Sequence, residues 1–247
     1  MSTAPLPPHP PLARYYGSDA ERPSMVKELF DEGAPYYEWT CRIMSFGTGE
    51  WYRAQALRDS GLQPGMRLLD VATGTGAVLR AAANLTGATG LAVGLDPSRG
   101  MLRECRKRSA APILQGRGES LPFPNATFDM VTMGYALRHT HDLHALFTEY
   151  RRVLKPGGRI LLLEITQPRS AAGRWFNKIY LGYIVPGVTR IATGAEAAGK
   201  MMRYFWDTIE TCVPPEVILE ALREAGFTNV RRNVTGGVMS EYRATNA

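Results

Sequence analysis

The residues best suited to bind a ligand follow the first strongly apolar run of the chain, Leu68–Ala72, which leads into the turn Thr73–Gly76. Gly74 and Gly76 lack a Cβ, so the backbone can bend sharply and approach a ligand, while the N-terminus of a following helix favours a negative group such as a carboxylate. Asp96 ends the next apolar run, twenty residues after Gly76. From there its carboxylate can accept hydrogen bonds from both hydroxyls of a ribose. These residues predict a site for a small ligand that carries a carboxylate and a sugar.

The same layout occurs in dinucleotide-binding dehydrogenases, but their pattern differs in one position. A GxGxxG motif that started at Gly74 would need glycine where this chain has Leu79. S-adenosylmethionine has no pyrophosphate, and its amino-acid end needs only the first tight turn. The shorter glycine pattern therefore favours S-adenosylmethionine. A strand-to-helix turn without any ligand is the alternative that this motif alone leaves open.

The elements around these residues predict an α/β fold. From Arg67 onward, short apolar runs alternate with helical patterns, and their continuous hydrophobicity is typical of parallel strands covered on both faces. The expected strands are Arg67–Ala72, Gly90–Asp96, Pro112–Arg117, Phe128–Tyr135 and Arg159–Ile165, and the expected helices between them are Ala77–Leu85, Ser98–Ser109 and Asp142–Leu154.

The last of these helices has clear ends, because Asp142 is a suitable N-cap and Lys155-Pro156-Gly157-Gly158 stops it. A late helix, Pro214–Ala225, precedes two strand-like runs, Asn229–Thr235 and Gly237–Tyr242. This closing hairpin would give the sheet an antiparallel edge. The predicted fold is thus a doubly wound, Rossmann-like, seven-stranded and mostly parallel sheet with an antiparallel C-terminal edge strand.

Two segments lie outside the alternation. Residues 19–62 are expected to form a helical cap, and residues 170–212 a helical lid inserted into the core of residues 63–247. Both are rich in aromatic residues, which either only cover the sheet or close over a bulky apolar substrate near the sheet edge. The proline-rich residues 1–18 are expected to be a loose, disordered tail.

Composition limits the other roles that the chain could have. The net charge is +6, but the densest basic run, Arg103 to Arg108, is typical of a solvated helix face, so no nucleic-acid partner is expected. The three cysteines form no CxxC pair, so neither disulfides nor a metal site is expected. No export signal and no uninterrupted apolar span is evident, which predicts a cytoplasmic protein.

Three further stretches give the chain a specific resemblance. They are Tyr37–Gly47, which contains Met44-Ser45-Phe46-Gly47, the run Gln115–Pro124, and Tyr135–His139 followed by Tyr150–Arg159. With the glycine turn, these stretches resemble the ubiquinone/menaquinone biosynthesis C-methyltransferase family over roughly residues 25–242. The resemblance implies an S-adenosylmethionine-dependent methyltransferase of the class I fold that acts on a quinol or another aromatic substrate with an apolar tail.

The resemblance also implies roles for individual residues. It places Thr75 and Asp96 on the cofactor, Arg117 and Gly118 beside the adenine, and Gly134 under the methyl donor. The full set of expected cofactor residues is Asp70, Ala72, Gly74, Thr75, Gly76, Asp96, Pro97, Met101, Arg117, Gly118, Glu119 and Gly134.

Three residues are candidates for catalysis. Arg138 and Tyr37 fall where the family faces its substrate, and His139 follows the fourth strand at the same edge. A neutral histidine can remove or share a phenolic proton at neutral pH, whereas Arg138 can orient a developing phenolate or hold a water that relays the proton. Arg138 is the preferred candidate. Simple packing for Tyr37 and a surface loop position for His139 remain the alternatives.

The chain departs from the family pattern near the expected substrate. Glu38 replaces the usual Asp, Cys41-Arg42 replaces an Asn-Asp pair, and His139 replaces an Asn. Arg117 cannot accept a hydrogen bond from the adenine amino group, so Glu119 is the expected substitute. The alternatives are therefore an O-, N- or C-methyltransferase of a lipid or secondary metabolite, or a non-catalytic scaffold that binds the cofactor. Peripheral contact with the inner membrane and a homodimer are further expectations.

Overall fold

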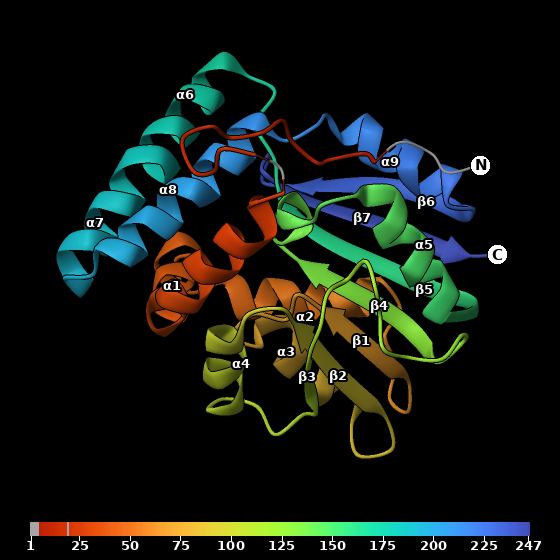
Figure 1. Cartoon of the computed structure of the whole chain (residues 1–247). Coiled ribbons are helices and arrows are strands. Elements are labelled where there is room, and N and C mark those ends of the chain that lie inside the picture. Colours follow the sequence, from red (N-terminus) through yellow and green to blue (C-terminus); the bar gives the residue numbers. More distant parts are fainter. Residues whose placement is uncertain (1–4, 19) are drawn as a thin grey trace.

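The computed structural model describes residues 5–18 and 20–247, which form a seven-stranded sheet covered by helices (Figure 1). The strand order is β3-β2-β1-β4-β5-β7-β6. Five strands run parallel, and β7 pairs antiparallel with both β5 and β6. The bounds are β1 Arg67–Val71, β2 Leu91–Asp96, β3 Ile113–Gln115, β4 Phe128–Gly134, β5 Leu154–Ile165, β6 Phe227–Thr235 and β7 Met239–Asn246. The predicted fold class is confirmed.

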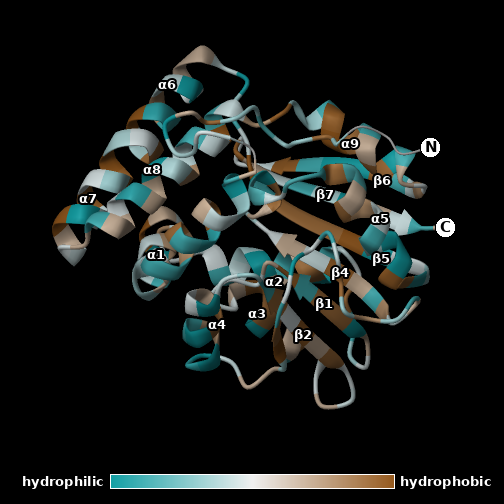
Figure 2. Ribbon diagram, viewed as in Figure 1, coloured by the Kyte–Doolittle hydropathy of each residue, from teal (hydrophilic) through white to brown (hydrophobic). Residues whose placement is uncertain are grey.

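Helices cover both faces of the sheet because its side chains alternate between them. Leu68 faces the layer formed by α2 (Gly49–Asp59) and α3 (Ala77–Thr86), whereas Leu69 faces the layer formed by α5 (Leu143–Val153) and α9 (Pro215–Glu224). Figure 2 shows the strands as a mostly hydrophobic layer between helices with hydrophilic outer faces. Burial on both faces explains why the strands are almost continuously apolar.

A third group of helices lies beyond the carboxyl ends of the strands. It consists of α1 (Arg22–Met44), α6 (Ala171–Ile179), the π-helical turn η2 (Tyr180–Ile184), α7 (Val185–Thr193) and α8 (Glu196–Thr211). A separate apolar cluster joins α1 to α8, with Leu29, Met201 and Phe205 buried in it. Within the described ranges, no helix combines the length and apolar character needed to cross a bilayer. Through this apolar cluster, the predicted cap (residues 19–62) and lid (residues 170–212) pack against each other beyond the carboxyl ends of the strands.

The proline-rich N-terminal segment does not match the loose tail that its composition favours. The backbone N–H of Leu6 donates to Asp142 Oδ1, that of Leu143 donates to the Leu6 carbonyl, and that of Val213 donates to the Pro8 carbonyl. His9 is buried. These contacts hold residues 5–18 against the fold without helix or strand, whereas residues 1–4 of the predicted tail lie outside the described residues. Long-range hydrogen bonds, which composition does not reveal, explain the difference.

Several element boundaries also differ from the predicted ones. Strand β5 begins at Leu154, so the Lys155–Gly158 run that was expected only to stop a helix lies within the strand, with Gly157 at φ +75°. The predicted N-cap is confirmed, because Asp142 accepts a hydrogen bond from the His144 N–H at 3.0 Å. At the C-terminal edge, β7 is inserted next to β5 and β6 lies outside it.

Candidate functional site

The glycine turn after β1 has the tight geometry that its sequence predicts. Gly74 and Gly76 have φ angles of +57° and +84°, and a Cβ on Gly76 would lie 2.6 Å from Cys105 Sγ. Ala72, which is not a glycine, also has a positive φ of +53°. Such backbone strain is concentrated at functional sites, where the surrounding structure maintains it. The surrounding structure therefore holds the turn in a tight conformation, with Gly74 at the edge of a cavity.

Asp96 at the end of β2 fixes this turn from the neighbouring strand. Its Oδ2 accepts a hydrogen bond from the Gly74 N–H at 2.8 Å, and its Oδ1 accepts one from the Ser98 N–H at 2.8 Å. Burial raises the pKa of Asp96 to about 6, against the effect of these two hydrogen bonds. The carboxylate lines a cavity. It is placed to accept further hydrogen bonds from the paired hydroxyls of a sugar.

Two residues of the predicted cofactor set, Asp70 and Gly76, shape the turn without lining the cavity. Both side-chain oxygens of Asp70 are used by hydroxyl donors, Thr73 at 2.6 Å and Thr132 at 2.8 Å. Burial raises the pKa of Asp70 to about 6. Neither Asp70 nor Gly76 lines the cavity. Asp70 and Gly76 therefore shape the turn, and their direct contact with the cofactor stays a prediction.

Thr75 is tied to the N-terminal helix instead of facing the cavity. Its hydroxyl donates to Glu38 Oε2 at 2.5 Å, and the other Glu38 oxygen pairs with Arg80 at 2.7 Å. These bonds lower the pKa of Glu38 although its burial acts in the opposite direction. The side chain of Thr75 therefore connects α1 to the glycine turn, and its contact with the cofactor stays a prediction.

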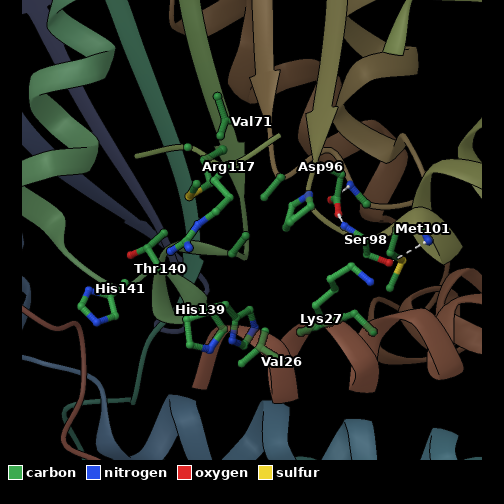
Figure 3. A pocket seen from close by; sticks show the side chains of 18 of the residues that line it. Val26, Lys27, Val71, Asp96, Ser98, Met101, Arg117, His139, Thr140 and His141 are labelled. Carbon is green, nitrogen blue, oxygen red and sulfur yellow. Dashed lines mark hydrogen bonds between the residues drawn. The ribbon is translucent and has the colours of Figure 1, made fainter. Parts of the chain in front are cut away.

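A cavity of about 330 Å³ lies between the strand ends and α1. Of the expected residues it is lined by Tyr37, Ala72, Gly74, Asp96, Pro97, Met101, Arg117, Gly118, Glu119, Gly134 and His139. Figure 3 shows Asp96, Ser98 and Met101 on one side of it and His139 and His141 on the other. The volume lies within the range of small-molecule sites. Segments from the whole first half of the chain thus converge on one site.

Two glycines of the cavity lining have no room for a side chain. A Cβ on Gly118 would lie 2.6 Å from Leu146 Cδ1, and one on Gly134 would lie 2.8 Å from Val78 Cγ2. Beyond Gly118, Glu119 Oε1 accepts a hydrogen bond from the His141 N–H at 2.8 Å, and its other oxygen lies 3.7 Å from Arg117 Nε. The Glu119 carboxylate is thereby held at the cavity as a hydrogen-bond acceptor.

The opposite side of the cavity is aromatic and contains His139. The imidazole stacks on Tyr204, with ring centroids 5.4 Å apart, and meets the edge of Phe30 at 5.0 Å. Both ring nitrogens are buried without a hydrogen-bond partner in the described part of the chain. Burial, assisted by the charge of Arg138, lowers the pKa of His139 well below 6.5. The ring is therefore neutral and offers one donor and one acceptor to a ligand.

Tyr37 lines the same side of the cavity. Burial raises the pKa of its hydroxyl well above 10, an effect increased by the nearby Cys41 thiol. Tyr37 is therefore protonated at neutral pH and can act only as a neutral hydrogen-bonding group.

Arg138 occupies a different place from the one predicted. Its side chain is fully buried and pairs with Glu164, which also accepts a hydrogen bond from the Leu137 N–H at 2.8 Å. The guanidinium lies over the Phe205 ring, 4.6 Å from its centroid. Arg138 does not line the cavity. Arg138 fixes the short helical turn η1 (Leu137–His139), which carries His139, and its contact with the substrate stays a prediction.

Several cavity residues were not among those predicted from the sequence. Arg22, Val26 and Phe30 line the cavity from α1, with Lys27 beside them. Their spacing of four residues places them on one face of a helix, and this spacing is the signal that would have identified them. Ser98 was also missed, although its hydroxyl caps α4 (Arg99–Arg106) by accepting from the Met101 N–H.

The three histidines that are close in sequence have separate surroundings. His139 and His141 line the cavity, whereas His144 Nε2 lies 3.0 Å from Glu224. Among residues 5–18 and 20–247, no three His, Cys, Asp or Glu side chains are grouped so that they could hold a metal.

Comparison with known proteins agrees with this geometry. Residues 17–246 match the model of the ubiE/COQ5 methyltransferase family. A demethylmenaquinone methyltransferase of Symbiobacterium thermophilum is 34% identical, and the match covers 85% of this chain and 87% of that protein. The ubiquinone/menaquinone biosynthesis C-methyltransferase UbiE of Geobacter sulfurreducens is 33% identical, with 90% and 88% covered.

The solved structures support the fold alone. The crystal structure of a SAM-dependent methyltransferase from Aquifex aeolicus has a TM-score of 0.60 at 18% identity, and the match covers 91% of this chain and 98% of that one. A SAM-dependent methyltransferase from Thermotoga maritima has a TM-score of 0.63 at 19% identity, with 90% and 100% covered. With the family match over residues 17–246, the chain belongs to the ubiE/COQ5 methyltransferase family and is an S-adenosylmethionine-dependent methyltransferase.

Proposed function

We propose that this enzyme methylates a ring carbon of a quinol or of another aromatic compound with an apolar tail. The observation that carries the proposal is a single cavity with two unlike ends. One end presents the Asp96 carboxylate, and the other presents an unpartnered imidazole between aromatic rings. The names of the related demethylmenaquinone and ubiquinone/menaquinone methyltransferases support an acceptor of this class.

The cofactor side of this proposal assigns direct contacts to the residues that line the cavity. Asp96 would hold the ribose, Gly74 the amino-acid end, and Pro97, Met101 and Glu119 the adenine. Gly118 and Gly134 would allow the close approach, since a side chain at either position would collide with the wall.

When bound, S-adenosylmethionine supplies a sulfonium whose methyl group is already activated for transfer. The main task of the protein is then to align the acceptor carbon with that methyl group in a site that excludes water. Phe30 and Tyr204 hold the ring of His139 in place, and its nitrogens are hidden from solvent. Since the pKa of His139 is low, the imidazole would hold a phenolic hydroxyl by a hydrogen bond rather than remove its proton completely.

Methyl transfer tests the proposal directly. The protein is incubated with S-adenosylmethionine and a panel of demethylated quinols that differ in tail length, and the products are analysed by mass spectrometry. We expect a methyl group on the ring carbon and a rate that rises with tail length. His139→Phe, which keeps the aromatic packing but removes both nitrogens, should lower kcat by 10- to 100-fold. The absence of any methylated quinol would refute the proposal.

The same panel decides between the proposal and its alternatives. A methyl group on oxygen or nitrogen would instead support the methylation of a lipid or secondary metabolite. The half-buried Cys41 beside Tyr37, which departs from the family pattern, favours this alternative. Titration calorimetry with S-adenosylhomocysteine tests the scaffold alternative, because a protein that binds the cofactor product but methylates no compound would not be an enzyme of this kind.

We also propose that the face formed by α6, η2 and α7 contacts a membrane surface. Its exposed apolar residues are Trp175, Phe176, Tyr183, Ile184, Val188 and Ile191. Residues 166–195 contain four arginines and lysines and no aspartate or glutamate. Apolar side chains between basic ones are typical of segments that lie in the interface of anionic bilayers. An acceptor with an apolar tail would be reached from the same surface.

Vesicle flotation tests this contact. The protein should float with vesicles that contain phosphatidylglycerol and less with pure phosphatidylcholine. The double variant Trp175→Ser with Ile191→Ser should bind both weakly while keeping its affinity for S-adenosylhomocysteine. Light scattering of the same sample would test the expected homodimer. If a dimer buried this face between its two copies, the membrane contact would be refuted.

A further inference from the structure

We propose that Arg22 forms an anion site at the acceptor end of the cavity, so that the enzyme binds its aromatic acceptor through a negatively charged ring oxygen, a phenolate or a carboxylate. The position of the acceptor rests on the proposed function. The charge of the site rests on the surroundings of Arg22 alone.

Arg22 is a buried cation without a negative partner. Its side chain begins α1 and lines the cavity, yet the residue is only 2% exposed. In the described part of the chain, no carboxylate lies within 4.0 Å of it. Its Nε is buried and has no hydrogen-bond partner there. Because an uncompensated buried charge is strongly disfavoured, such a group attracts an anion from solution.

The two partners that Arg22 does have are both neutral. Nη2 donates to His9 Nε2 at 2.9 Å and to the Arg138 carbonyl at 3.0 Å. His9 donates from Nδ1 to the Pro10 carbonyl at 2.7 Å, which leaves Nε2 as the acceptor. Burial lowers the pKa of His9 to about 4, so the imidazole carries no charge at neutral pH. These bonds orient the guanidinium and leave its charge unbalanced.

The other charged groups of the cavity do not neutralise Arg22. Asp96 lies on the opposite side of the cavity, where it accepts from the Gly74 and Ser98 N–H groups. Glu119 accepts from the His141 N–H and lies 3.7 Å from Arg117. Lys27 is paired with Asp31 at 2.8 Å. Arg117, which also lines the cavity, has the Glu119 carboxylate as its neighbour. Arg22 is therefore the cation that remains for an anionic ligand.

The position of Arg22 indicates which ligand that is. It donates to the carbonyl of the residue before His139, whose ring lies at the aromatic end of the cavity and whose pKa the charge of Arg22 helps to lower. Aromatic walls, a neutral imidazole and one cation suit an aromatic ring with an ionised oxygen. Ionisation of a phenol also increases the electron density on its ring carbons, which is the property that a carbon nucleophile needs.

Binding of charged and neutral probes tests the inference. We would saturate the protein with S-adenosylhomocysteine and titrate 2-naphthoate and the uncharged 2-naphthamide by calorimetry. The wild type should prefer naphthoate at least tenfold, Arg22→Gln should bind both equally, and Arg22→Lys should keep part of the preference. Arg14→Gln is the matched control, since Arg14 is exposed and lies 3.9 Å from Asp207. This control should leave the preference unchanged.

The protonation state of a bound phenol gives a second readout that needs no variant. The anion of 4-nitrophenol absorbs visible light and its acid does not. Its pKa should be about one unit lower when it is bound to the wild type, which corresponds to a tenfold preference for the anion. A wild type without either effect would overturn the inference even if Arg22→Gln failed to fold.

The cofactor itself carries a carboxylate, so its binding is the decisive comparison. The affinity for S-adenosylhomocysteine should stay within twofold of the wild type in Arg22→Gln. A tenfold loss would assign Arg22 to the cofactor and overturn the inference. Conversely, a wild type that does not bind S-adenosylhomocysteine at all would refute the proposed function, and the naphthoate preference would then be judged alone.

Discussion

Replacement of Glu164 by glutamine would leave the guanidinium of Arg138 charged in a site without water. The two side chains are 3% and 0% exposed, so solvent screens neither of them. Loss of one member of a fully buried pair costs about 3–5 kcal/mol, because the remaining charge has no counter-ion. For a protein of this size, about 1 kcal/mol shifts Tm by roughly 2–4 °C. We therefore expect Tm to fall by about 6–20 °C.

An exposed ion pair of the same chain is the matched control. Lys178 and Glu210 are 50% and 39% exposed and lie 3.0 Å apart. Lys178→Gln should change Tm much less than Glu164→Gln, because solvent screens this pair. Urea unfolding followed by circular dichroism, with calorimetric Tm values, would measure both variants under the same conditions.

A double replacement separates the two explanations of a loss. Arg138→Met combined with Glu164→Leu removes both charges and should recover most of the stability, since apolar pairs of similar volume often replace buried ion pairs without loss. If Glu164→Gln were no more destabilising than Lys178→Gln, the reasoning about desolvation would be wrong. The recovered double variant should still have a lower kcat if the pair positions η1 and His139.

Three further perturbations probe other parts of the structure. Asp96→Ala removes the acceptor of the Gly74 and Ser98 N–H groups. Calorimetry should show that it weakens S-adenosylhomocysteine binding by about 10- to 100-fold. An unchanged affinity would exclude Asp96 from the cofactor site. Gly118→Ala would press a Cβ into the cavity wall and should cost about 1–3 kcal/mol in urea unfolding. Gly187→Ala, within α7 and with nothing within 4 Å of its Cβ, should be neutral or stabilising, and equal losses at both glycines would contradict the packing argument. The pKa of His9 is 6.5 in the unfolded chain and about 4 in the folded protein, so between these values only the unfolded chain takes up the proton. The free energy of unfolding of the wild type should therefore fall as the pH drops through this window, by up to about 3 kcal/mol more than that of His9→Gln. If the free energies of unfolding of the wild type and of His9→Gln changed by the same amount between pH 7 and pH 4, His9 would not be buried as a neutral ring.

The sequence by itself determined the order of the elements and the ligand side of the sheet. Local patterns are sufficient for this, because the period of apolar residues, the caps and the glycine turn act within a few residues of each other. The turn at Gly74 and the acid at the end of β2 were therefore identified correctly as neighbours across parallel strands. The same reasoning failed at the beginning of β5, where pairing of Leu154 with Phe128 of β4 extends the strand ahead of the turn residues, whereas the end at Ile165 agrees with the prediction.

Only the tertiary structure decided which polar residues face the cavity and which support it. Asp70, Thr75 and Arg138 have the residue types of a binding site, but Thr73, Glu38 and Glu164 use their polar atoms. Their partners lie as close as three residues and as far as 37 residues away in sequence, so composition and spacing do not show whether a side chain is already paired. The unpaired state of Arg22 and the neutral state of His139 depend likewise on burial. Burial is a property of the packed chain, and for this reason the chemistry of the acceptor end became visible only in the folded protein.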